Sequence, residues 1–263
     1  MPLRADASAE NRQVKRNAVR ASALSIATPS EWLKHMVEES QILGAGSEVR
    51  CVPNGVDTRI FRPGDKLAAR RELGLPEDAQ IGVFAAKGLK SSQFKGFETL
   101  TTALTLLGGR QTDAMRIFVA LGEDAPAERI GGVELRYSAF LTDPEQVARY
   151  YQAADLYVHP ALAENAPLAI IEAMACGTAV VASEVGGIPE LVADGETGLL
   201  FPARNPAALA DAVETLLGDK SRRAAMGAAA LERVRERYTL ERQVDAYLAW
   251  YDELMEERRA SRS

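Results

Sequence analysis

Cysteine and histidine are scarce in this chain, which has two of each among 263 residues. Cys51 and Cys176 each lie in or beside an apolar run, which is typical of buried free thiols rather than a disulfide and fits a reducing cytoplasm. His35 is expected to be an exposed helix residue, and His159 is the second histidine. Without a His/Cys/Asp cluster or an Asp-x-Asp triplet, the sequence predicts no metal site and no cofactor.

A surplus of positive charge and a long apolar run are also missing. The net charge of -6 and the pI near 5.2 argue against a broad basic surface for nucleic acid. No apolar run approaches the roughly 20 residues that span a membrane. Residues 1–20 are polar and lack the apolar core of a signal peptide, so we expect a solvated or frayed lead-in and a cytoplasmic protein. The basic stretch from Lys15 to Arg20 leaves weak peripheral contact with an anionic membrane as an alternative.

Short apolar strands and helical segments alternate along most of the chain. We expect a doubly wound α/β domain with a parallel sheet covered on both faces, from residue 47 to 238. A strand at 23–30 and a helix at 31–43, capped by Ser30, precede it. The expected strands are 48–53, 80–86, 115–122, 133–140, 155–160, 178–183 and 197–202, and the expected helices are 66–75, 96–107, 143–154, 167–176, 188–193 and 205–217.

The remaining segments have weaker patterns. Asn54-Gly55 is a strong turn signal at the start of a loop. Residues 239–255 carry an apolar stripe at helical spacing that must pack on something, and residues 257–263 are expected to be a frayed tail.

One loop and helix pair shows an unusual distribution of carboxylates. The helix expected to start at Pro167 follows a strand, and Asn165 is placed to cap it. Free N–H groups of its first turn, from Ala166 to Ala169, would form an anion site, to which a phosphate or diphosphate is suited. Taken alone this signal is weak, because every fold of this class has several helix N-termini.

Glu172 stands in the middle of this almost wholly apolar helix, and Glu164 lies on the loop before it. A buried carboxylate without a partner is costly, and a pair of sugar hydroxyls would satisfy both oxygens of Glu172. A solvent-facing Glu172 is an equal alternative. Glu164 could bind a ligand or a cation, although a solvated loop carboxylate is the simpler interpretation.

Two further loops could face the same crevice, because each follows a strand. Gly186 and Gly187 would allow a close approach of the backbone to a ligand, or form an ordinary turn. Lys87, Lys90 and Lys95 lie between a strand and a helix, where a cation could neutralise a departing phosphate; solvated lysines are the alternative.

Four segments in one order resemble the retaining glycosyltransferase family 4. They are "VPNGVDTRIFRP", "KGFETLTTAL", "ENAPLAIIE", which matches the E-x7-E motif, and "AMACGTAVVASEVGGIPELVADGETGLLFP". The resemblance covers roughly residues 23–217. It implies the GT-B architecture of two Rossmann-like domains, metal-independent chemistry, and retaining transfer from a nucleotide-diphosphate sugar to a glycan or lipid-linked acceptor.

The resemblance also implies roles for individual residues. Glu172 falls where members hold the donor ribose, and Glu164 where they hold the transferred sugar and its developing charge. Lys95 matches the cation beside the diphosphate, so Glu164 and Lys95 are the expected catalytic pair. Lys87 stands near the position of a usual arginine. The segment expected to contact sugar hydroxyls and diphosphate consists of Asn165, Ala166, Pro167 and Leu168.

The family pattern also suggests a domain division. Residues 1–46 resemble the end of an N-terminal acceptor domain, residues 47–238 the donor domain, and residues 239–263 the crossing helix and tail. We expect a truncated transferase, with a separate N-terminal domain or self-association supplying the missing surface. The alternative is a nucleotide-sugar-binding module without activity of its own; a GT-B epimerase or phosphorylase fits the motifs less well.

Overall fold

The computed structural model describes residues 8–22, 24–44, 47–85 and 87–260. It divides into two compact units, Met1–Pro53 and Asn54–Ser263. The predicted start of the first strand at residue 23 and the residues after 260 in the predicted tail lie outside the described residues. No helix within the described ranges is both long enough and apolar enough to cross a membrane.

The first unit contains a parallel pair of short strands and two helices: α1 (Ser8–Arg20), β1 (Ser25–Thr28), α2 (Glu31–Glu38) and β2 (Glu48–Cys51). Residues 8–20 form an exposed polar helix, so this part of the lead-in is solvated as expected but is not frayed. Ser30 caps α2 by accepting from the Leu33 N–H, as predicted. The helix ends at Glu38 rather than residue 43, because the Ser40 hydroxyl accepts from the Ile42 and Leu43 N–H groups and forms a turn.

The second unit is built on a seven-stranded sheet with the order β5-β6-β4-β3-β7-β8-β9. All neighbouring strands are parallel except β5, which is antiparallel to β6. This confirms the predicted doubly wound α/β class; the three-residue edge strand β5 was not predicted. The strands are β3 (Gln80–Ala85), β4 (Arg116–Leu121), β5 (Glu128–Ile130), β6 (Val133–Ser138), β7 (Leu156–His159), β8 (Ala179–Ser183) and β9 (Gly198–Phe201).

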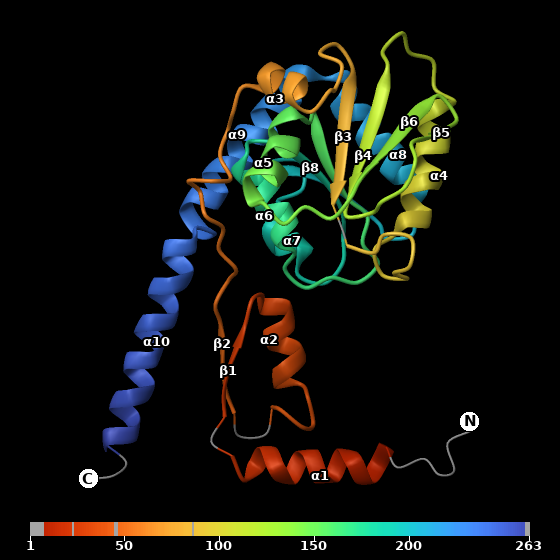
Figure 1. Ribbon diagram of the computed structural model, residues 1–263. Coiled ribbons are helices and arrows are strands. Elements are labelled where there is room, and N and C mark those ends of the chain that lie inside the picture. The colour runs from red at the N-terminus through yellow and green to blue at the C-terminus, as the bar shows by residue number, and fades with distance from the viewer. Residues whose placement is uncertain (1–7, 23, 45–46, 86, 261–263) are drawn as a thin grey trace. The chain divides into compact units, whose positions relative to one another are not determined.

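Helices cover both faces of this sheet (Figure 1). Alternate residues of a strand enter different cores: Val119 packs into one cluster and Phe118 into the other. One face is covered by α4 (Phe97–Gly108) and α8 (Pro206–Gly218). The other is covered by α3 (Lys66–Glu72), α5 (Pro144–Ala153), α6 (Leu168–Ala175), α7 (Ile188–Leu191) and α9 (Lys220–Arg237).

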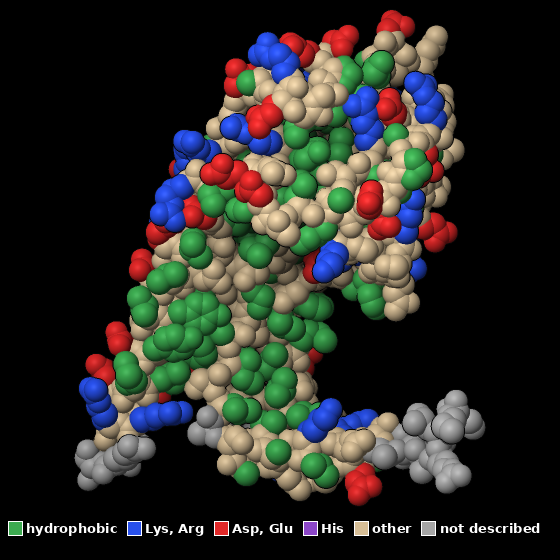
Figure 2. All heavy atoms as spheres, in the orientation of Figure 1, with side chains coloured by type: hydrophobic (Ala, Val, Ile, Leu, Met, Phe, Trp, Pro, Cys, Tyr) green, Lys and Arg blue, Asp and Glu red, His purple; other side chains and the backbone are tan. Residues whose placement is uncertain are grey.

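Helix α9 was not predicted from the sequence, and α10 (Leu240–Ala260) is longer than expected. Residues 257–260 are helical, so the prediction of a frayed tail is wrong there. Figure 2 shows hydrophobic side chains gathered along α10. Several members of its stripe remain at the surface: Val244, Leu248, Tyr251 and Met255.

Asn54-Gly55 forms no turn, so the predicted turn is wrong. The Val56 N–H donates to the Tyr238 carbonyl at 2.9 Å, and the Leu240 N–H donates to the Val56 carbonyl at 2.9 Å. A Cβ on Gly55 would lie 2.3 Å from the Thr239 carbonyl oxygen. Glycine is therefore needed here for close approach to the start of α10 and not for a turn.

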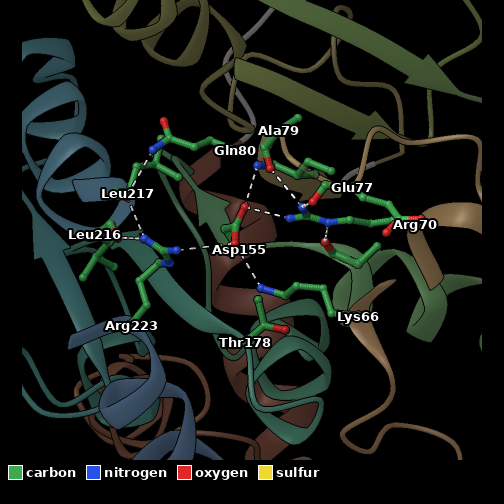
Figure 3. A network of polar contacts seen from close by, with 12 residues as sticks. Lys66, Arg70, Glu77, Ala79, Gln80, Asp155, Thr178, Leu216, Leu217 and Arg223 are labelled. Atoms are coloured by element: carbon green, nitrogen blue, oxygen red, sulfur yellow. Dashed lines mark hydrogen bonds and ion pairs between the residues drawn. The ribbon is translucent and has the colours of Figure 1, made fainter. Parts of the chain in front are cut away.

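A network of ionic contacts surrounds Asp155 at the amino-terminal edge of the sheet (Figure 3). One carboxylate oxygen accepts from Lys66 at 3.0 Å, and the other accepts from Arg70 at 2.8 Å and from the Ile81 N–H at 2.8 Å. Arg223 lies 3.5 Å from the first oxygen. Burial tends to raise the pKa of Asp155, but Lys66, the Ile81 amide and Arg70 outweigh it and hold the pKa below its ordinary value. This carboxylate links α3, β3, β7 and α9.

Candidate functional site

The polar residues singled out from the sequence gather at the opposite, carboxyl edge of the sheet. From β3 the chain moves outward to β4 and β6, and then returns to the other side of β3 with β7. The loops after β3 and β7 therefore diverge from a topological switch point, where ligands of open α/β sheets bind.

A cavity of about 310 Å³ lies at this edge. It combines residues from both sides of the switch point, including Leu121 at the end of β4 and Glu172 of α6. Two residues predicted from the sequence, Lys87 and Glu172, contribute to it. The lining consists of Phe61, Ala85, Lys87, Leu121, Gly122, Phe140, Leu141, Thr142, Pro144, Val147, Tyr151, Ala169 and Glu172.

Glu172 is partly buried, and its carboxylate has a neutral partner. The hydroxyl of Tyr151, from α5, donates to Glu172 Oε2 at 3.2 Å. Burial raises the pKa of Glu172, and the hydrogen bond from Tyr151 opposes that rise. A neutral hydroxyl balances a buried carboxylate only in part, so this side chain gains from further hydroxyl donors in the cavity.

Glu164 and Lys95 form a direct ion pair, with Lys95 Nζ 2.8 Å from Glu164 Oε2. His159 Nε2 lies 3.8 Å from the same oxygen. The His159 imidazole and the Lys95 ammonium outweigh the effect of burial and lower the pKa of Glu164 to about 2. Glu164 is therefore an ionised carboxylate, and the alternative of a freely solvated loop residue is wrong.

The loops that carry this pair are held together by their backbones. The Leu162 N–H donates to the Phe94 carbonyl at 2.7 Å. Gly96 has φ +70°, and a Cβ there would lie 1.7 Å from the Pro160 carbonyl oxygen. Only glycine fits this approach, which brings the chain beside Lys95 against the segment that follows β7.

The start of α6 differs from the prediction. The helix begins at Leu168 after Pro167, and no side chain caps it, so Asn165 is not the cap. Proline has no N–H, and its ring restricts the preceding residue to extended conformations, which places Asn165 outside the first turn. The Ala166 carbonyl accepts from Asn54 Nδ2 at 3.0 Å. Leu168 is 46% exposed.

The other predicted residues lie on neighbouring loops. Gly186 has φ +55°, and Gly187 precedes α7 as its N-cap; neither lines the 310 Å³ cavity. The Lys87 ammonium lies over the Phe140 ring at 5.2 Å, and Lys90 lies over the Tyr137 ring at 4.3 Å. Lys87 thus enters the cavity wall, whereas Lys90 does not.

Sequence reasoning missed Tyr151, Tyr157 and His159. Tyr157 and His159 are two residues apart on β7, so strand periodicity alone would have placed them on one face. Tyr151 had a weaker signal, because it reaches Glu172 from another helix. Among the residues described, no group of three or more His, Cys, Asp and Glu side chains could hold a metal ion.

The arrangement suits an anionic ligand rich in hydroxyls. Free N–H groups of the first turn of α6 and the ammonium groups of Lys87 and Lys95 favour negative charge. Glu172 favours hydroxyl donors in the cavity, and Glu164 offers a fixed negative charge beside Lys95.

Known proteins resemble this chain in sequence and in fold. Residues 81–219 match the family described as Glycosyl transferases group 1. The chain is 36% identical over 203 residues to a D-inositol 3-phosphate glycosyltransferase of Corynebacterium glutamicum, covering 71% of this chain and 47% of that protein. A protein with the same description from Acidothermus cellulolyticus is 34% identical over 230 residues, covering 81% and 50%. The chain thus spans about half the length of these relatives.

Solved structures agree in fold. A sucrose-phosphate synthase from Thermosynechococcus elongatus superposes with a TM-score of 0.79 at 26% identity, covering 97% of this chain and 65% of that one. Anabaena HepE, solved in complex with UDP and glucose, superposes with a TM-score of 0.73 at 20% identity, covering 93% of this chain and 67% of that one.

Proposed function

The chain belongs to the group 1 glycosyl transferases, and from this premise we propose that it forms the donor side of a retaining, family 4 enzyme of the GT-B type. It binds a nucleotide-diphosphate sugar and takes part in transfer of the sugar to a glycan or lipid-linked acceptor. The proposal rests on one observation: the Glu164–Lys95 pair and the partly buried Glu172 flank the start of the same helix, α6.

In this proposal the cavity holds the nucleoside. Glu172 accepts hydrogen bonds from the ribose hydroxyls. Because Glu172 lies further along α6 than its first turn, the ribose and the phosphates bind at different places on the helix. The diphosphate lies at the free N–H groups of the first turn, with Lys95 beside it. HepE, which shares this fold and was solved with UDP and glucose bound, supports this ligand class.

The reaction breaks the bond between the anomeric carbon and the distal phosphate oxygen and forms a bond from that carbon to an acceptor hydroxyl oxygen. The acceptor proton passes to the departing phosphate oxygen on the same face, which retains configuration. Lys95 and the helix N–H groups stabilise the charge on the leaving group, and Glu164 stabilises positive charge that develops on the sugar. Segment 165–168, Lys87 and the Gly186-Gly187 turn complete the proposed binding surface.

The direct test is binding, because it does not require an acceptor. UDP, GDP and ADP, with their glucose conjugates, are titrated into the purified chain by calorimetry and by thermal shift. We expect one nucleoside diphosphate to bind, and Glu172→Ala to weaken it about tenfold. Glu77→Ala removes an exposed carboxylate elsewhere and should change nothing. Absence of binding by all three at millimolar concentration would refute the donor site.

Transfer is assayed next with the nucleotide sugar that binds. The acceptor panel includes glycans, lipid-linked sugars and D-inositol 3-phosphate, the last because the curated relatives carry that compound in their names. A chain that binds the donor but transfers to no acceptor would be a binding module, the alternative function.

A further inference from the structure

A buried imidazole beside Glu164 has one nitrogen without a hydrogen-bond partner. Tyr157 and His159 lie on the same face of β7, and both are almost fully buried. The Tyr157 hydroxyl is 3.0 Å from His159 Nδ1. On the other side, His159 Nε2 has no hydrogen-bond partner and lies 3.8 Å from Glu164 Oε2. That distance is too long for a hydrogen bond and too short for the two groups to be independent.

The environment decides which nitrogen carries the proton. Burial lowers the pKa of His159, against the opposing effect of Glu164, so the ring is neutral at pH 7. If Nδ1 carried the proton, the lone pair of Nε2 would face an ionised carboxylate. If Tyr157 donates to Nδ1, the proton lies on Nε2 and points toward Glu164, which is favourable. The Nε2–H tautomer therefore agrees with both neighbours.

The backbone of this segment is held in place. The Ser183 hydroxyl, at the end of β8, donates to the Ala161 carbonyl at 2.5 Å and contacts the His159 carbonyl at 3.4 Å. The imidazole is thus fixed on the sheet, whereas Glu164 lies on the loop that follows. Any shortening of the 3.8 Å gap requires movement of Glu164 toward His159.

We propose that His159 is a positioning residue for Glu164, with its tautomer set by Tyr157. In the free protein Lys95 is the close partner of Glu164. When a diphosphate draws Lys95 away, Glu164 loses part of its counter-charge, and the Nε2–H of His159 closes the gap and replaces that interaction. Glu164 then stays ionised and fixed against the sugar. This inference rests on the proposed function, since it assumes that Lys95 meets a diphosphate.

The chain is well suited to a spectroscopic test, because it contains only two histidines. Labelling with 15N-histidine gives two spin systems, and exposed His35, with 73% of its side chain accessible, serves as the internal reference. At pH 7 we expect His159 to be the neutral Nε2–H tautomer. Tyr157→Phe should produce a mixture of tautomers, and Glu164→Gln should shift the Nε2 resonance. A saturating concentration of the glucose conjugate of the nucleotide that binds should move the resonance of the His159 Nε2 proton downfield.

Affinity gives a second, independent readout. His159→Phe should weaken the binding of the glucose conjugate about tenfold, which is the size expected for the loss of one hydrogen bond to a charged group. Binding of the free nucleoside diphosphate should weaken as well, because its diphosphate also draws Lys95 away from Glu164. His159→Gln, whose amide nitrogen can occupy the place of Nε2, should recover most of the loss and also controls for folding.

The outcomes separate the two hypotheses. If no nucleotide binds the wild type, the proposed function fails, and with it the premise of this inference. Two results would refute the positioning role and leave the donor site standing, provided that nucleotide binds. One is an Nδ1–H tautomer of His159. The other is an Nε2 resonance that changes neither with Glu164→Gln nor with the sugar conjugate. Unchanged affinity of His159→Phe for the sugar conjugate would also refute it.

Discussion

Replacement of Asp155 by alanine should be among the most destabilising single changes in the second unit. The substitution removes the carboxylate that lies between Lys66 and Arg70 and accepts from the Ile81 N–H. The side chain of Arg70 is only 4% exposed, so water cannot replace the lost partner. Its remaining contacts are to backbone carbonyls, which do not neutralise its charge.

The size of the effect follows from these contacts. Removing one partner of a buried ion pair costs about 3–5 kcal/mol, because a buried charge is left uncompensated. The orphaned Ile81 N–H, at the start of β3, would alone cost about 1–3 kcal/mol. The two effects overlap, so we expect a loss of about 4 kcal/mol for Asp155→Ala. Asp155→Asn retains an acceptor for the amide and should lose less.

Urea unfolding followed by far-UV circular dichroism measures the change in the free energy of unfolding. Asp211→Ala is the matched control, since Asp211 pairs with Arg110 but has 71% of its side chain exposed; its cost should stay below about 1 kcal/mol. In a double-mutant cycle, Arg70→Met should recover part of the loss in Asp155→Ala. A cost for Asp155→Ala no larger than that of the control would refute the reasoning. Nucleotide binding should be unchanged in folded protein, because the network lies at the opposite edge of the sheet.

Three other predictions concern the carboxyl edge. Gly96→Ala should lower the free energy of unfolding by more than about 2 kcal/mol, because its Cβ would meet a backbone oxygen at 1.7 Å. The control is Gly74→Ala, where φ is similar but the space is open. Its cost, also measured by urea unfolding, should be only about 1 kcal/mol. Nucleotide binding at a pH just above the ordinary pKa of a glutamate should release protons, since ligand hydroxyls favour the ionised form of Glu172, whose pKa is raised in the free protein. Calorimetry in buffers of different ionisation heat measures the release, and its persistence in Glu172→Gln would contradict the assignment. The depressed pKa of Glu164, about 2, contributes stability that is present above its ordinary pKa and is lost as pH falls toward 2. Lys95→Met raises the pKa of Glu164, so the melting temperature of this variant should fall less than that of the wild type between pH 6 and 3. An equal or steeper fall would count against the ion pair of Glu164 and Lys95.

The sequence predicted the class of fold because its strands and helices follow simple periodicities. The inner strands β3, β4, β7 and β8 are short and largely apolar, and Asp143 and Asn205 accept from the first turns of the predicted helices. Two kinds of local signal failed. Asn54-Gly55 has the composition of a turn, but Gly55 instead lies against the start of α10. Helix α9 mixes charged residues with small buried ones, Gly227 and Ala230 among them.

The candidate site could be predicted only where its residues are close in sequence. Glu164 and Glu172 bracket the start of one helix, so their spacing was visible. Their partners come from elsewhere: Lys95 lies 69 residues from Glu164, and Tyr151 lies 21 residues from Glu172. Only the order of the strands brings these side chains together, and no local pattern encodes that order.

The switch in strand order has a consequence for biosynthesis. The ribosome delivers β3, β4 and β6 before β7 and β8, so the nascent chain first holds one half of the sheet, with one side of β3 unpaired. Ala85 and Leu121 of the cavity wall belong to that half, and Tyr151 and Glu172 arrive later. At usual rates of elongation the interval from Ala85 to Glu172 is on the order of ten seconds. During it the exposed edge is open to pairing with other chains, so yield should depend on translation speed and on chaperones that shield strand edges.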